Sequence, residues 1–182
     1  TGNFFEVPNP DLGPERSNTF ELGNKLDFKQ ILRASSSVYV TLFSDKITRE
    51  ATSFEGAGEI DGKNVVHRVN RDTAYNYGFE LEAETYPIVV DTSLYGNMAW
   101  VDGAIEAAAE DSSFQPGLMH DVLGGGEFYS NPRRLPPLQW LVGAKWEKWG
   151  AYGKIWAKGN LAQDKLSPAD AKDLRICEAV PG

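Results

Sequence analysis

Residues 73–85 alternate between two kinds of side chain with a period of two. One set of alternate positions is aromatic or aliphatic and holds Tyr75, Tyr77, Phe79, Leu81 and Ala83. The other set is polar and holds Asn76, Glu80, Glu82 and Glu84. An α-helix, with 3.6 residues per turn, would spread both sets around its circumference. The pattern therefore predicts a β-strand with one apolar face and one acidic face exposed to water.

Five other stretches alternate in the same way, so we expect six strands in all. The other five cover residues 19–28, 32–43, 92–102, 138–146 and 155–163. The proline-containing residues 1–18 predict an irregular loop, and a short helix is expected at residues 104–110. The fold class is therefore all-β, as an antiparallel up-and-down meander with nearest-neighbour pairing.

The connections between these strands alternate between short and long. Short links are expected at residues 29–30, 86–91 and 150–153, and long ones at residues 45–64 and 103–137. In a meander this order places every tight turn at one end of the sheet and every long loop at the other. Outer-membrane β-barrels have this asymmetry, with periplasmic turns and extracellular loops, whereas a soluble sandwich has no reason to sort its loops.

Composition narrows the class of partner. The chain has 182 residues, the length of one ordinary domain or of a piece of a larger protein. Its net charge is -8, which excludes nucleic acid as a partner because phosphate binding needs a basic surface. The single cysteine, Cys177, cannot form an internal disulfide. With no signal peptide and no initial methionine, the chain is expected to be a processed or excised segment.

Hydropathy predicts no transmembrane helix, because no run of about 18 apolar residues exists. A membrane-spanning β-strand needs only about ten residues, with alternate side chains facing lipid. The alternating stretches are long enough for that role.

No constellation of residues predicts catalysis, a metal site or a cofactor. His67 and His120 are far apart and stand in no metal-ligand spacing with Cys177. The three glycines at residues 124–126 lack the Gly-Lys-Ser/Thr ending of a phosphate-binding loop. We interpret Glu80, Glu82 and Glu84 as solvated side chains on the wet face of their strand rather than as paired catalytic acids.

Three stretches resemble the TonB-dependent receptors. Residues 9–23, N-P-D-L-G-P-E-R-S-N-T-F-E-L-G, are similar to the family signature N-P-x-L-K-P-E-x-S-x-x-x-E-L-G, with Gly13 where the family usually has lysine. A strand pattern N-x-x-x-A-x-x-x-G-x-E-x-E is matched by Asn70, Ala74, Gly78, Glu80 and Glu82. R-L-P-P-L at residues 134–138 precedes a tryptophan-bearing hairpin and then Q-D-K-L-S at residues 163–167. The three stretches follow the family order across nearly the whole chain.

The resemblance implies a 22-stranded barrel in the bacterial outer membrane with an N-terminal plug. Such a receptor binds a scarce nutrient, such as a siderophore, haem or cobalamin, and admits it with energy from TonB. The implied partners are outer-membrane lipid, the rest of the barrel and plug, TonB through the plug, and a small-molecule nutrient. The chain looks like strands fourteen to nineteen, so residues 1–182 are expected to form one barrel segment without the plug, the TonB box or the last strands.

The two long connections are the expected ligand-binding loops, since the family binds ligand with extracellular loops and the plug apex. The candidate contacts are aromatic or basic: Arg68, Arg71, Phe114, His120, Phe128, Tyr129, Arg133 and Arg134.

A self-contained secreted β-sandwich or small barrel that binds a carbohydrate or an apolar ligand is the alternative. One observation separates the two hypotheses. A sandwich packs Leu22, Val40, Tyr77 and Trp140 into one core, whereas a receptor segment leaves them pointing outward.

Overall fold

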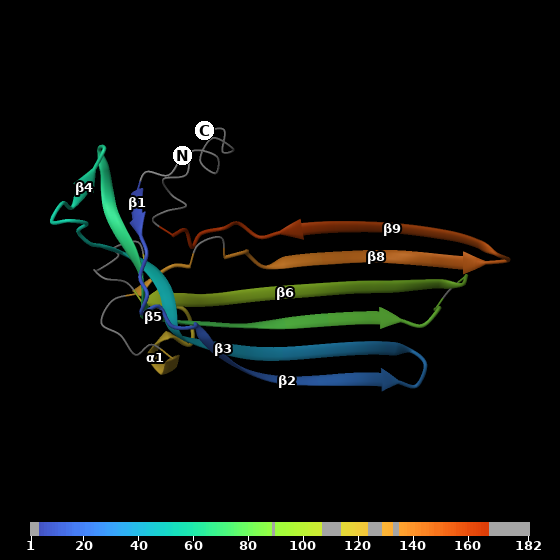
Figure 1. Ribbon diagram of the computed structural model, residues 1–182. Helices are drawn as coiled ribbons and strands as arrows, with labels where there is room; N and C mark the ends of the chain where they lie inside the picture. Colours follow the sequence, from blue (N-terminus) through green and yellow to red (C-terminus); the bar gives the residue numbers. More distant parts are fainter. Residues whose placement is uncertain (1–3, 89, 107–113, 124–128, 133–134, 168–182) are drawn as a thin grey trace.

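The computed structural model describes residues 4–88, 90–106, 114–123, 129–132 and 135–167, and these form one β-sheet with connecting loops (Figure 1). The strands are β1 Phe4–Val7, β2 Arg16–Phe28, β3 Leu32–Ala51, β4 Glu59–Ile60, β5 Lys63–Thr85, β6 Thr92–Glu106, β7 Tyr129–Ser130, β8 Gln139–Lys148 and β9 Ala151–Asn160. A single helical turn, α1, covers His120–Leu123.

Six long strands lie side by side in the order β2-β3-β5-β6-β8-β9, each antiparallel to its neighbour. This order confirms the predicted meander. The β8–β9 hairpin turns at Trp149 and Gly150, both with positive φ (52° and 77°), as a two-residue hairpin turn requires. The tight turns gather at one end of the sheet, while β1, β4 and α1 lie at the other (Figure 1).

Several predicted boundaries are wrong at the end with the long loops. Residues 45–51 and 63–72, expected in or beside a loop, continue β3 and β5 and pair with each other from Ile47↔Asn70 to Ala51↔Val66. A register shift between Phe43 and Lys46, with Asp45 at φ 57°, breaks the period of two and conceals this extension in the sequence.

Other observed elements also differ in their boundaries from the predicted ones. Phe4–Val7, expected to be irregular, forms β1 and pairs in parallel with β5. Residues 104–106, expected in a helix, belong to β6, and residues 107–110 lie outside the described part. Strand β9 begins at Ala151 and ends at Asn160, earlier than expected at both ends.

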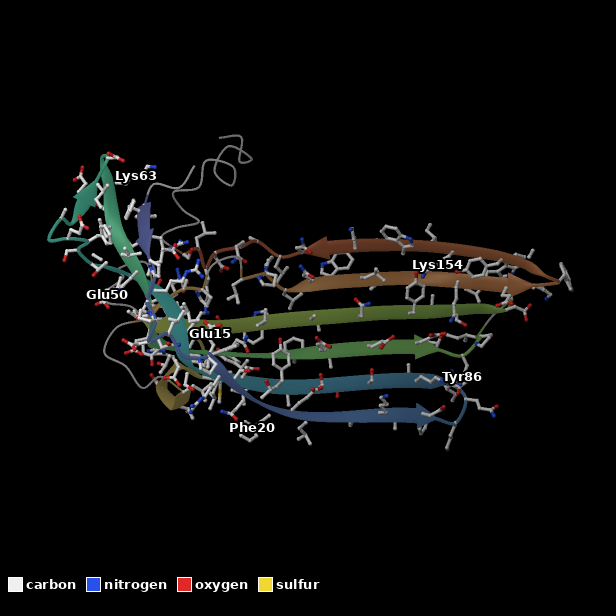
Figure 2. The ribbon with its side chains drawn as sticks, in the orientation of Figure 1. Glu15, Phe20, Glu50, Lys63, Tyr86 and Lys154 are labelled. Atoms are coloured by element: carbon white, nitrogen blue, oxygen red, sulfur yellow. The ribbon has the colours of Figure 1, made fainter. Side chains whose placement is uncertain are left out.

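The register sorts the side chains of the long strands onto two faces (Figure 2). The apolar face presents large exposed groups: Phe20, Leu22 and Leu26 of β2, Val38 of β3, Leu94 of β6, Val142 of β8 and Ile155 of β9. The polar face presents Glu21, Lys25, Ser35, Ser37, Glu80, Glu82 and Asn97, which border an open groove of about 800 Å³. The sheet is thus a single layer whose apolar face is largely open.

The contact pattern separates the two hypotheses drawn from the sequence. Leu22 is 74% exposed and Trp140 36% exposed, so the described residues do not form the sandwich core. Tyr77, however, is only 7% exposed, and Val40 is half-buried against its cluster. All four lie on the apolar face, as the receptor hypothesis expects, but Tyr77 is covered there by residues around Gly117 and Met119.

Large rings from neighbouring strands fill the space over glycines within the sheet. A Cβ atom on Gly78 would lie 2.7 Å from the Tyr39 hydroxyl, and one on Gly143 would lie 2.5 Å from the Tyr95 ring. Trp140 covers Gly159 in the same way, at 2.6 Å. This cross-strand packing fixes the register of β3 against β5, of β6 against β8, and of β8 against β9.

Candidate functional site at the long-loop end

Three of the predicted ligand contacts come together on β7, α1 and the loop between β6 and α1. The ring of His120 lies 5.0 Å from that of Phe114 and 4.8 Å from that of Tyr129, and both pairs are close to perpendicular. The Tyr75 hydroxyl is 2.7 Å from His120 Nδ1, and the Tyr75 ring lies 6.0 Å from that of Tyr129. We call Tyr75, Phe114, His120 and Tyr129 the aromatic cluster.

The aromatic cluster sits on the apolar face of the sheet, on the side away from the glutamates. Tyr75, Tyr77, Ala104 and Tyr129 are buried together, and Val40, Trp100, Phe114, Met119 and Leu123 pack against them. Tyr75 and Tyr129 are 3% and 6% exposed. The described residues of this connection therefore fold back over the apolar face, where Tyr129 is buried and Phe114 and His120 are half-buried.

A buried carboxylate, Asp102, fastens this loop to the sheet. Its Oδ2 accepts a hydrogen bond from Tyr77 Oη at 2.9 Å and from Lys165 Nζ at 2.7 Å. Its Oδ1 accepts from the Gly103 amide at 2.9 Å, and the whole residue is 3% exposed. We call Tyr77, Asp102 and Lys165 the Asp102 latch. A buried charge needs such partners, because leaving it unpaired in a low-dielectric site is costly.

The latch holds two segments that are distant in sequence. The Met119 amide donates to Tyr77 Oη at 3.3 Å. Gly117 packs so closely that a Cβ atom would lie 2.1 Å from Asp102 Oδ2. Lys165 brings in the segment after β9, where Asn131 Nδ2 also donates to the Leu166 carbonyl at 3.1 Å. Sequence reasoning missed Asp102, although an acid that follows Met98 and Trp100 in the same alternate set of β6 was a usable signal.

Arg68, another predicted contact, is engaged elsewhere. Its Nε donates to Glu6 Oε1 at 2.6 Å, and Arg49 Nε donates to Glu6 Oε2 at 3.2 Å. The hydrogen bond from Arg68, followed by the one from Arg49, lowers the pKa of Glu6 below its ordinary value of 4.5. These two ion pairs tie β1 to β3 and β5. The Arg71 side chain and residues Phe128, Arg133 and Arg134 lie outside the described part of the structure.

Asn70 joins the two signature stretches that the sequence singled out. Its Nδ2 donates to the carbonyls of Gly13 at 2.9 Å and Asp45 at 2.8 Å, and its Oδ1 accepts from the Gly13 amide at 2.7 Å. All these contacts are to main-chain atoms. We call these contacts of Asn70 with Gly13 and Asp45 the Asn70 clamp. Because they use main-chain atoms, glycine can stand at position 13 where the family usually has lysine, and a Cβ atom there would lie at an ordinary 3.6 Å from Asn70 Oδ1.

Neither a metal centre nor a spanning helix is found in the described part. There, no three His, Cys, Asp or Glu side chains gather as metal ligands would. The same residues contain no helix that is long and apolar enough to cross a membrane.

A single-layered antiparallel sheet with one apolar face, and with its tight turns at one end and its long loops at the other, is the arrangement expected of a β-barrel segment. The sequence profile described as "TonB dependent receptor-like, beta-barrel" matches residues 1–173. The chain belongs to this family.

Among solved structures, the "Copper transporter OprC" superposes with a TM-score of 0.57 at 18% sequence identity. The match covers 86% of this chain and 20% of that one, so the chain spans about a fifth of its length. No curated protein matches the chain.

Proposed function

We propose that the chain forms part of the wall of a TonB-dependent transporter in the bacterial outer membrane. The open apolar face of the six-stranded meander is the observation that carries the proposal. Leu22, Val38 and Ile155 are each more than half exposed on it. A continuous apolar surface of this extent is unusual on a protein surrounded by water but is required against lipid.

The sheet edges support a larger barrel. In the described residues, β2 and β9 each pair along one side only. Open strand edges are not tolerated in the hydrocarbon region, because their amide and carbonyl groups would lack partners. The 22-stranded barrel of the family would supply neighbours for both edges, and the groove beside Glu80 and Glu82 would face its plug.

The substrate we propose is a small, scarce nutrient such as a siderophore, haem or cobalamin. OprC is titled a copper transporter, and its likeness to this chain concerns the fold, so copper is one member of the panel to be tested. Uptake by the full-length receptor should be measured with each nutrient, in cells with and without TonB. We expect one nutrient to enter only when TonB is present. Equal uptake in both strains for every nutrient would contradict the proposal.

For ligand contact we retain the predicted residues that the structure does not show to be buried. They are Arg68, Arg71, Phe114, His120, Phe128, Arg133 and Arg134. Phe128, Arg133 and Arg134 would offer stacking and charge to an anionic, aromatic chelate, and arginine suits both roles. Tyr129, the remaining predicted contact, is 6% exposed and packs against Tyr75, so it would reach a ligand only from within the aromatic cluster.

The loop's role in binding can be tested in the full-length receptor after surface expression is verified. Arg133→Ala with Arg134→Ala should weaken ligand affinity, whereas Lys29→Ala, which removes a positive charge at the tight-turn end, should not. Deleting residues 112–127 should also lower affinity and uptake. Unchanged affinity in both the double variant and the deletion would leave the loop without this role.

A further inference from the structure

The segment around α1 presents apolar side chains to two sides. Met119 and Leu123 pack inward against the buried tyrosines. Leu118 and Val122, four residues apart, do not share this packing and are 86% and 74% exposed. A surface helical turn in water normally carries polar residues on its outer side. Here two of the three exposed residues at 117–123, Leu118 and Val122, are large and apolar, and the third is Asp121.

We call the exposed residues of the apolar face, such as Phe20, Leu22 and Val38, the apolar belt. The segment around α1 lies close to one end of this belt. The Met119 amide binds the Tyr77 hydroxyl, and Tyr77 lies opposite Val40, which in turn lies opposite Phe20. Phe20 is 64% exposed and begins the apolar series of β2. In Figure 1, α1 lies beside the long strands at this end, and Figure 2 marks Phe20 near the same end of β2. Leu118 and Val122 therefore extend the proposed lipid-facing surface at its outer rim.

We propose that residues 117–123 are an interfacial anchor, which seats Leu118 and Val122 in the outer leaflet at the boundary between headgroups and acyl chains. The proposal rests on the proposed function, since it requires the belt to face lipid. Continuity with that belt selects lipid as the occupant. Apolar groups that lie against a membrane surface in this way are held by burial of their area at the boundary.

The Asp102 latch sets the depth of the anchor. Gly117 leaves no room for a side chain, because a Cβ atom added there would lie 2.1 Å from Asp102 Oδ2 and 2.5 Å from the Tyr77 hydroxyl. Asp102 is itself held by Lys165 and the Gly103 amide. A larger residue at position 117 must therefore lift the segment off the sheet or break the latch.

Spin labels in the full-length receptor, reconstituted in lipid bilayers, test the anchor. In a Cys177→Ser background, labels are placed by Leu118→Cys or Val122→Cys. Leu22→Cys serves as the control for the belt, and Glu59→Cys on β4 as the control for water. Collision of each label with oxygen, which partitions into lipid, is compared with collision with a water-soluble nickel chelate.

We expect the labels at 118 and 122 to collide more with oxygen than with nickel, as at 22, and the label at 59 to do the reverse. Nickel-dominated collision at 118 and 122, with lipid contact at 22, would overturn the anchor and leave the transporter proposal intact. Low collision with both reagents would show a protein partner instead of lipid and would also overturn it. A nickel-dominated signal at 22 would refute the membrane placement itself.

Gly117→Ala tests the role of the latch in the same assay. The label at 122 should shift toward nickel contact, while the label at 22 stays unchanged. An unaltered label at 122 would show that the latch does not set the depth.

Discussion

Asp102 shows how a single residue can depart from the pattern around it and still fit the fold. Its position belongs to the apolar set of β6, yet it is an acid and is 3% exposed. Its charge is balanced by Lys165, 63 residues later in the chain. The sequence contains a signal for this exception, which sequence reasoning missed, but no local rule names the partner, since the pair forms only when the segment after β9 returns to β6.

Lys165→Met should destabilise the long-loop end, because it removes the cation from a buried carboxylate. Breaking one partner of a buried pair costs about 3–5 kcal/mol, and the lower end applies because the Lys165 side chain is 23% exposed. Hydrogen exchange of residues 114–123 measures the loss. Lys158→Met, an exposed lysine on β9, is the matched control and should leave this exchange unchanged.

The docking of β1 should depend on pH through Glu6. The folded protein lowers the pKa of Glu6, so its stabilising effect is complete above the ordinary value of 4.5 and is lost as the pH falls through the lower, folded value. Proteolysis near Phe4–Val7 should therefore accelerate in acid. In the Glu6→Gln variant, cleavage at neutral pH should already be faster and should respond less to acid; an identical acid response would contradict this role.

At the scale of elements, alternation predicted the six long strands and their order. It failed where the backbone departs from a regular ladder, because the irregularity between Phe43 and Lys46 shifts the register and hides the extensions of β3 and β5. It also missed β1, whose four residues carry too short a pattern and pair in parallel with a strand about 60 residues away. The packing of the aromatic cluster over the apolar face is a tertiary contact, and the periodicity of the sequence does not predict it.

Asn70→Ala should loosen residues 9–15 from the sheet. The substitution removes hydrogen bonds to the main chain of Gly13 and Asp45, each contributing about 0.5–1.5 kcal/mol. Limited proteolysis within residues 9–15 measures the effect. Asn64→Ala, at an exposed position near the β4 hairpin, is the control. Equal protection of residues 9–15 in both variants would show that the clamp does not hold this segment.

For the whole molecule, the asymmetry between the two faces of the sheet is the property from which the function is inferred. The candidate site was predicted only in part: the sequence named Phe114, His120 and Tyr129, but not that they pack over the apolar face together with Tyr75. The side of a sheet that a long loop covers is decided by tertiary partners such as Asp102, which lie outside the loop. The proposed function requires the apolar face to lie against lipid and the polar face to line the interior of the barrel.

The most direct test compares arginine substitutions at adjacent positions of β3 in the full-length receptor folded into bilayers. Val38 is 54% exposed on the apolar face, and Ser37 lies on the polar face opposite Glu80. The free energy of unfolding should fall by about 2–4 kcal/mol for Val38→Arg, as for an arginine near the bilayer midplane, and change little for Ser37→Arg. Equal losses at both positions would contradict the assignment of the apolar face to lipid.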